Sequence, residues 1–245
     1  MSDTTVRWVD LRPRDDAAAV EAAIRRVIEA GWFVLGPEGD AFETEFAEAT
    51  NGGRTVGVAS GTDALTLTLR ALGIGTGDEV ITTALSAVYS AQAIVMAGAR
   101  PVFADIDPDR LTLDPAAVEA LVGPSTAAII PVHLYGQPAD LPALAKVADR
   151  HGLVVVEDAA QGVGSRFKGR MAGTFGAAGT YSFYPAKTLG SFGDAGAVVC
   201  NDDEVARQVR LLGDHGRNED GHVVGWGVNS RLDNLQAAVL LVRLE

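Results

Sequence analysis

Short apolar segments and amphipathic segments alternate along the middle of this 245-residue chain, and this alternation limits the fold more than any other feature. The apolar segments have the length and composition of strands, whereas the amphipathic ones carry apolar residues at helical spacing. Strands separated by helices need crossover connections, which place the strands parallel with helices on both faces. The sequence therefore predicts a three-layer α/β fold around a mostly parallel sheet. The predicted strands span 55–59, 79–82, 100–105, 127–132 and 153–157, and the predicted helices span 63–72, 90–97, 115–121 and 141–151.

The segments nearer the two ends extend this pattern. Helices are predicted over 15–30 and 39–49, strands over 180–183 and 196–200, and a helix over 204–213. A last helix begins at Leu232 and runs to Glu245. Its apolar stripe needs a partner surface, and we expect part of it to face water unless a further domain covers it. The stripe consists of Leu235, Ala238, Val239, Leu241 and Val242.

The composition narrows the class of protein. A hydrophobic content of 47% is enough for one large domain or two small ones. The net charge of -12 argues against a basic surface for nucleic acid. Cys200 is the single cysteine, which excludes an intrachain disulfide and a cysteine-rich zinc site and fits a reducing compartment. The first residues lack the pattern of a secretory signal, and no apolar run reaches the length of a membrane span. We therefore expect a cytoplasmic protein without a metal site.

Lys187 and Asp158 are the two residues that point to a particular chemistry. Lys187, one of three lysines, follows the segment 180–186, and Asp158 closes the apolar strand predicted over 153–157. Pyridoxal phosphate needs a lysine amine to hold its aldehyde as a Schiff base and a carboxylate to keep its ring nitrogen protonated. Taken alone, the two residues are also typical of a solvated surface lysine and a helix cap. The interpretation depends on their combination with the residues around them.

Other polar residues fall where parallel sheets bind ligands, at the carboxyl ends of strands. The segment 60–63 (SGTD) joins a strand to a helix, so its amides and the Thr62 hydroxyl can receive a phosphate, although the same residues make a good helix cap. Gln161 follows Asp158 by three positions. Ser182 lies within a predicted strand, where a serine is more often a small packed residue than a phosphate ligand.

With these segments assembled, the sequence resembles the DegT/DnrJ/EryC1/StrS family of sugar aminotransferases, a branch of the fold-type I pyridoxal phosphate enzymes. The resemblance covers nearly the whole chain and implies a fold-type I large domain over 1–245. The matching segments include Gly36, 42–46 (FETEF), 59–65 (ASGTDAL), 77–81 (GDEVI), 132–136 (VHLYG), 157–161 (EDAAQ), 182–187 (SFYPAK), 193–196 (GDAG) and 229–233 (NSRLD).

The resemblance implies catalytic roles for two residues and a cofactor contact for a third. Lys187 would carry the cofactor as a Schiff base and then move a proton between the substrate carbon and the cofactor carbon. Asp158 would pair with the pyridinium nitrogen. Gln161 would hydrogen-bond the phenolic oxygen of the cofactor.

The resemblance also implies a phosphate site and a homodimer. Gly61, Thr62 and Ser182 would hold the phosphate of the cofactor. Asn229 would reach the phosphate bound in the neighbouring subunit, so that each site needs both chains.

The chain departs from the family pattern in two places. Many relatives place an aromatic residue against the cofactor ring where this chain has Ala87, and Tyr89 comes two positions later. Family members also continue into a smaller C-terminal domain of about 100 residues. Because the chain stops at Glu245, we expect that domain to be absent or only begun.

The function implied is a ping-pong transfer of an amino group from glutamate to the ketone of a nucleotide-linked deoxysugar. A cyclitol ketone is an alternative acceptor. A sugar dehydratase of the same family would have histidine in place of the Schiff-base lysine, and Lys187 argues against it. A catalytically silent homologue that binds the cofactor or a full-length partner is the alternative from another class.

Overall fold

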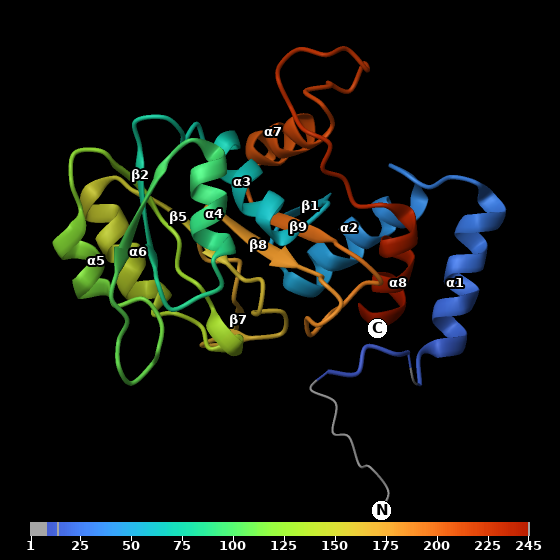
Figure 1. Ribbon diagram of the computed structural model, residues 1–245, viewed down its shortest axis with the longest axis horizontal. Helices are drawn as coiled ribbons and strands as arrows, with labels where there is room; N and C mark the ends of the chain where they lie inside the picture. The colour runs from blue at the N-terminus through green and yellow to red at the C-terminus, as the bar shows by residue number, and fades with distance from the viewer. Residues whose placement is uncertain (1–8, 14, 245) are drawn as a thin grey trace, which may run out of the picture.

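A seven-stranded sheet forms the centre of the computed structural model, which describes residues 9–13 and 15–244 (Figure 1). Its strand order is β1-β9-β8-β5-β4-β2-β3. Strand β9 pairs antiparallel with both neighbours, and the other four pairings are parallel. The predicted mostly parallel sheet is confirmed. The strands are β1 (Arg54–Val58), β2 (Glu79–Thr83), β3 (Arg100–Ala104), β4 (Thr126–Ile129), β5 (Val154–Asp158), β8 (Ala178–Ser182) and β9 (Gly196–Cys200).

Helices cover both faces of the sheet, which gives the three layers predicted. On one face α3 packs against both α4 and α7. On the other face lie α5, α6, α2 and α8, and α1 packs on the outer side of α8 (Figure 1). The helices are α1 (Ala17–Ala30), α2 (Pro37–Thr50), α3 (Gly61–Ala71), α4 (Tyr89–Ala97), α5 (Pro115–Leu121), α6 (Leu141–His151), α7 (Asp203–Gly213) and α8 (Asn234–Leu244).

Local capping signals fix where several of these helices begin. Ser60 Oγ accepts a hydrogen bond from Asp63 N at 3.1 Å at the start of α3. Asp114 does the same for α5 with Ala116 N at 2.9 Å. Such side-chain acceptors satisfy amides that have no partner within the helix. Because such signals are local, the predicted bounds of these helices agree closely with those observed.

The two faces of the sheet hold separate cores. Phe42 and Phe46 of α2 pack with Tyr181 and Phe183 on one face, with ring centroids 5.1 to 5.4 Å apart. On the other face α3 and α7 cover apolar residues of β1, β8 and β9, including Cys200. Burial raises the pKa of the Cys200 thiol to about 11, as expected for a cysteine that serves packing.

A short hairpin and a 3₁₀ turn were not predicted. The strands β6 (Arg166–Phe167) and β7 (Arg170–Met171) form a small hairpin after β5. A 3₁₀ turn, η1 (Leu134–Gly136), follows β4. Both lie in segments too short for a periodic pattern of apolar residues.

The expectation that part of the α8 stripe faces water holds for three of its five residues, which stay partly exposed. Ala238 and Val239 are buried, and Leu235, Leu241 and Val242 are partly buried. The cover comes from the same chain, because α1 and α2 both pack against α8. In particular, Ala23 and Val27 of α1 form a small core with Ala238.

Neither a membrane-spanning helix nor a metal-binding cluster occurs among the described residues. No helix among them combines the length and apolar character needed to cross a bilayer. The same residues contain no group of three or more histidine, cysteine, aspartate or glutamate side chains placed to hold a metal ion.

Candidate functional site

The site predicted from the sequence lies at the carboxyl edge of β1, β5 and β8. Asp158 is the last residue of β5, and Ser182 is the last residue of β8 rather than a mid-strand residue. Gly61 starts α3 directly after β1. The strands between them are in register, since Asp158 pairs with Thr180. The sheet therefore gathers residues that are more than a hundred positions apart in sequence.

Asp158 is a buried carboxylate, 5% exposed, with a hydrogen-bond donor on each oxygen. Its Oδ1 accepts from Ala160 N at 3.1 Å, and its Oδ2 accepts from Ser90 Oγ at 2.6 Å. A hydrogen bond from a hydroxyl to a carboxylate at this distance is charge-assisted and strong. The two donors hold the carboxylate plane in one orientation.

Lys187 lies half-buried in the loop 183–195 between β8 and β9. Burial lowers the pKa of its amine below the ordinary value, and the charge of Asp158 opposes that shift. The loop itself is anchored, because Ser191 Oγ lies 2.8 Å from Phe183 O and 2.6 Å from Gly193 O and shares its one proton between them. The loop therefore places an amine with a lowered pKa within the electrostatic reach of a fixed carboxylate.

Gly61 and Ser182 form a tight corner at the start of α3. A Cβ at Gly61 would lie 2.7 Å from Ser182 Cβ, and one at Gly196 would lie 2.8 Å from Gly61 N. Only glycine fits such a close approach. The corner thus joins a serine hydroxyl to the N-terminus of α3, where backbone amides favour an anion. Thr62, partly buried, follows in the first turn.

A second chain segment is tied to this corner through Ser230. Ser230 Oγ donates to Asp63 Oδ2 at 2.9 Å and accepts from Ala59 N at 3.1 Å. Asn229, next to it, is exposed and pairs through its backbone with Asp214. Asn229 is therefore an exposed residue directly beside the serine that is tied to the start of α3.

Gln161 is oriented by a backbone amide. Its Oε1 accepts from Tyr135 N at 2.6 Å, which leaves the Nε2 amide as the group able to donate to a ligand. Tyr135 has φ of 51° within η1, a backbone conformation that is unfavourable for a residue other than glycine. The strained backbone of η1 therefore places the Tyr135 amide where it orients the Gln161 side chain.

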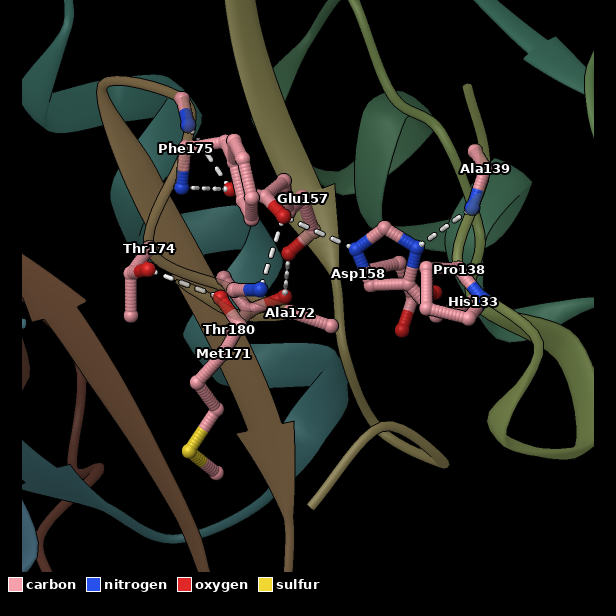
Figure 2. A network of polar contacts seen from close by, with 12 residues as sticks. His133, Pro138, Ala139, Glu157, Asp158, Met171, Ala172, Thr174, Phe175 and Thr180 are labelled. Carbon is pink, nitrogen blue, oxygen red and sulfur yellow. Dashed lines mark hydrogen bonds and ion pairs between the residues drawn. The ribbon is translucent and has the colours of Figure 1, made fainter. Parts of the chain in front are cut away.

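Glu157 and His133 form a buried network behind the site (Figure 2). Glu157 accepts from Gly173 N, Phe175 N and Gly176 N at 2.5 to 2.7 Å, and its Oε2 lies 2.9 Å from His133 Nε2. Ala139 N donates to His133 Nδ1 at 3.2 Å. The network ties the end of β5 to the loops 133–139 and 171–176.

The segment around Ala87, where the resemblance implies an aromatic residue against the cofactor ring, is exposed in this chain. Ala87 is exposed, and Tyr89, the first residue of α4, is 58% exposed. Neither side chain is buried among the residues of the site. Ser90, one position further on, is the residue of this segment that reaches the site.

Sequence reasoning missed the partners Ser90, His133 and Glu157 as functional residues. His133 and Glu157 stand inside the quoted segments 132–136 and 157–161, but nothing local in the sequence pairs them. Ser90 and Asp158 are 68 positions apart. Only the packing of α4 over the sheet brings the hydroxyl to the carboxylate.

The residues present fit pyridoxal phosphate. The site offers an amine with a lowered pKa at Lys187, a fixed carboxylate at Asp158 and an amide donor at Gln161. It also offers the corner of Gly61 and Ser182, which an added Cβ would fill. These groups match the aldehyde, the ring nitrogen, the phenolic oxygen and the phosphate of that cofactor.

Comparisons with known proteins agree with this assignment. Residues 14–245 match the model of a family described as the DegT/DnrJ/EryC1/StrS aminotransferase family. The chain is 50% identical over 227 residues to dTDP-3-amino-3,4,6-trideoxy-alpha-D-glucose transaminase of Streptomyces venezuelae, covering 93% of this chain and 60% of the relative. It is 49% identical over 242 residues to the erythromycin biosynthesis sensory transduction protein EryC1 of Saccharopolyspora erythraea, covering 99% of this chain and 65% of the relative.

A solved structure with the same fold is that of S. venezuelae DesV in complex with a ketimine intermediate. It superposes with a TM-score of 0.95 at 48% identity, over 98% of this chain and 65% of that chain. The chain thus spans less than two thirds of the length of these relatives.

Proposed function

The chain belongs to the DegT/DnrJ/EryC1/StrS aminotransferase family, and we propose that its described residues form the pyridoxal phosphate-binding large domain of a sugar aminotransferase. One observation carries the proposal: the half-buried Lys187 amine, with its lowered pKa, lies within the field of the buried Asp158 carboxylate. A solvated surface lysine or a simple helix cap would not combine these properties. The polar groups of Gln161 and Ser182 around this pair support the same assignment.

Each residue of the site would have its own role in the reaction. When bound, pyridoxal phosphate supplies an aldehyde that captures an amino group and a ring that accepts electrons from the substrate carbon. Lys187 Nζ would bind that aldehyde and afterwards accept and return the proton of the substrate carbon. The lowered pKa favours the neutral amine that both tasks need.

The remaining groups would hold and orient the cofactor. Asp158 would hold a proton at the ring nitrogen, and Gln161 Nε2 would donate to the phenolic oxygen. The amides at the start of α3, with Thr62 and Ser182, would bind the phosphate.

We propose glutamate as the amino donor and a nucleotide-linked keto-deoxysugar as the acceptor. Glutamate is the donor that the family resemblance implies, and support for the acceptor comes from the relative of S. venezuelae, which is named as a transaminase of a dTDP-linked deoxysugar. A cyclitol ketone stays the alternative acceptor. A silent cofactor-binding protein stays the alternative from another class, and it has support of its own, because a relative of similar identity carries a sensory transduction name.

We also propose that the site is completed in a homodimer through Asn229. The segment between α7 and α8 rises clear of the rest of the chain (Figure 1). It carries Val223, Val224 and Trp226, which are 63%, 61% and 92% exposed. Apolar side chains gathered on a projecting segment are typical of a protein interface. The exposed Asn229 stands at the base of the same segment.

The experiment that tests the function separates an enzyme from a binding protein. The chain is loaded with pyridoxal phosphate, and its absorbance is followed on addition of glutamate and then of a dTDP-linked keto-deoxysugar. Loss of the aldehyde band with glutamate and its return with the keto sugar would support the transaminase. A cofactor band that neither substrate changes would favour the silent protein, and its return with a cyclitol ketone alone would favour that acceptor.

A further inference from the structure

Ser90 makes a contact that the proposed function does not assign. It is the second residue of α4, is 2% exposed, and donates from Oγ to Asp158 Oδ2 at 2.6 Å. Within the described residues it is the one side chain that donates a hydrogen bond to this carboxylate. Because a carboxylate accepts only, the single Ser90 proton is committed to Asp158. The neighbouring Ser86 hydroxyl, 3.4 Å away, is then left to donate to Ser90.

The position of Ser90 is itself rigid. Ala93 and Ile94, on the next turn of α4, are fully buried and pack with Leu65 and Leu69 of α3. Side chains in such a close-packed core have little freedom to shift. The hydroxyl that contacts Asp158 is therefore held by a rigid helix and not by a loop.

Two donors from different elements restrain Asp158. Ala160 N binds one carboxylate oxygen from the chain directly after β5, and Ser90 binds the other from α4. If the hydroxyl is removed, the carboxylate keeps one local restraint and can rotate about its Cβ–Cγ bond. A terminal carboxylate torsion of this kind is broad unless hydrogen bonds fix it. The orientation toward a ligand would then be lost while the charge is kept.

We propose that Ser90 is a positioning residue, whose hydroxyl fixes the Asp158 carboxylate in the orientation that binds the protonated ring nitrogen of pyridoxal phosphate. This rests on the proposed function. Ser90 acts through Asp158 and does not touch the cofactor itself. A purely structural role would instead make it one more buried hydroxyl that satisfies a polar neighbour.

The test compares Ser90→Ala with Ser90→Thr, which keeps the hydroxyl, and with Thr82→Val as a matched control. Thr82 is a fully buried residue of β2 whose hydroxyl donates to Ile130 O at 3.0 Å, away from Asp158. The readouts are the dissociation constant of pyridoxal phosphate, the ¹⁵N chemical shift of its ring nitrogen in the bound state, and the melting temperature. Ser90→Cys, similar in volume but a weak donor, replaces Ser90→Ala if that variant does not fold.

If Ser90 positions Asp158, the variants should differ in a specific way. Ser90→Ala weakens cofactor binding about tenfold, the effect of one charge-assisted hydrogen bond, and moves the ¹⁵N signal toward the unprotonated position. Ser90→Thr keeps the wild-type signal, and Thr82→Val lowers only the melting temperature. In an Asp158→Asn background, Ser90→Ala adds no further loss of binding, because the two residues act as one unit.

Three results would overturn it. The first is a wild-type ¹⁵N signal and affinity in Ser90→Ala. The second is an equal loss of binding in Ser90→Ala and Thr82→Val, which would leave a structural role only. The third is a wild-type chain that binds no pyridoxal phosphate, and this one removes the proposed function as well, whereas the first two leave it standing.

Discussion

His133 Nε2 lies 2.9 Å from Glu157 Oε2, and both side chains are fully buried. Since His133 Nδ1 accepts from Ala139 N, the ring carries its proton on Nε2 and donates it to the carboxylate. Glu157 then has four donors, one from the histidine and three from the backbone of the loop 171–176. Adjacent carboxylates on β5 therefore have different tasks, because Glu157 holds loops together while Asp158 faces the site.

We predict that Glu157→Gln destabilises the chain by about 3 kcal/mol. An amide has one acceptor oxygen, so whichever position its nitrogen takes, two of the four donors lose their acceptor. Equilibrium unfolding in urea measures the loss. Glu119→Gln is the control, since Glu119 pairs with Arg150 on the exposed surface and should change stability little. Equal stability of the two variants would contradict the buried network.

Lys187→Ala should abolish the link to pyridoxal phosphate that borohydride reduces, because the site holds no other lysine. Peptide mapping of the reduced adduct by mass spectrometry gives the answer. Lys146 in α6 and Lys168 in the β6–β7 turn serve as internal controls. A specific label on either of them in the wild-type chain would refute the assignment.

The lowered pKa of Lys187 predicts a pH profile with a definite sign. The free amine becomes available below the pH at which an ordinary lysine reacts, so labelling of Lys187 with acetic anhydride should rise at lower pH than labelling of Lys146. Asp158 raises this pKa, so Asp158→Asn should lower it further and move the profile to still lower pH. Peptide-resolved labelling of the cofactor-free chain checks both steps. An unchanged profile in Asp158→Asn would show that the charge of Asp158 does not act on Lys187.

Gly61→Ala should disturb the phosphate corner. Its new Cβ would lie 2.7 Å from Ser182 Cβ, so β8 or α3 must shift, at a cost of about 1–3 kcal/mol. We expect lower stability together with weaker binding of pyridoxal phosphate, measured by unfolding and by absorbance titration. Gly123→Ala is the matched control, because a Cβ there meets nothing within 4 Å. Unchanged cofactor affinity in Gly61→Ala would remove this corner from the binding site.

Trp226→Ser should weaken self-association of the chain. The indole is 92% exposed on the projecting segment, and burying an aromatic side chain of this size stabilises a protein interface strongly. Sedimentation velocity over a range of concentrations measures the shift from dimer to monomer. Tyr184→Ser, another exposed aromatic but in the β8–β9 loop, gives a comparison. A wild-type chain that stays monomeric at all concentrations would contradict the dimer.

The sequence predicted the sheet and its helices because their signals are local. Apolar spacing along segments such as 141–151, with Asp140 before it and Gly152 after it, marks a helix and its ends within one stretch of chain. The hairpin β6–β7 and η1 escaped because each is only two or three residues long. Tyr135 enters η1 through a positive φ that its residue type does not suggest.

The sequence predicted only those site residues whose type alone indicates a chemical role. Lys187, Asp158 and Gly61 are recognisable as residue types at the ends of predicted strands. Ser90 is not, because its role depends on contact with Asp158, a residue 68 positions away. The α8 stripe shows the same limit, since its spacing indicates that a partner surface is needed but not that α1 supplies part of it.

The antiparallel strand β9 has a consequence for how the lysine reaches its place during folding. Ser182 and Gly196 pair across β8 and β9, so the loop that carries Lys187 is closed by two strands that follow each other in the chain. Closing a short loop has a small entropic cost and occurs on a fast time scale. The corner of Gly61 and the contact of Ser90 with Asp158, by contrast, must wait until distant segments meet. The reactive amine is therefore carried by a local hairpin, and the rest of the pocket assembles around it.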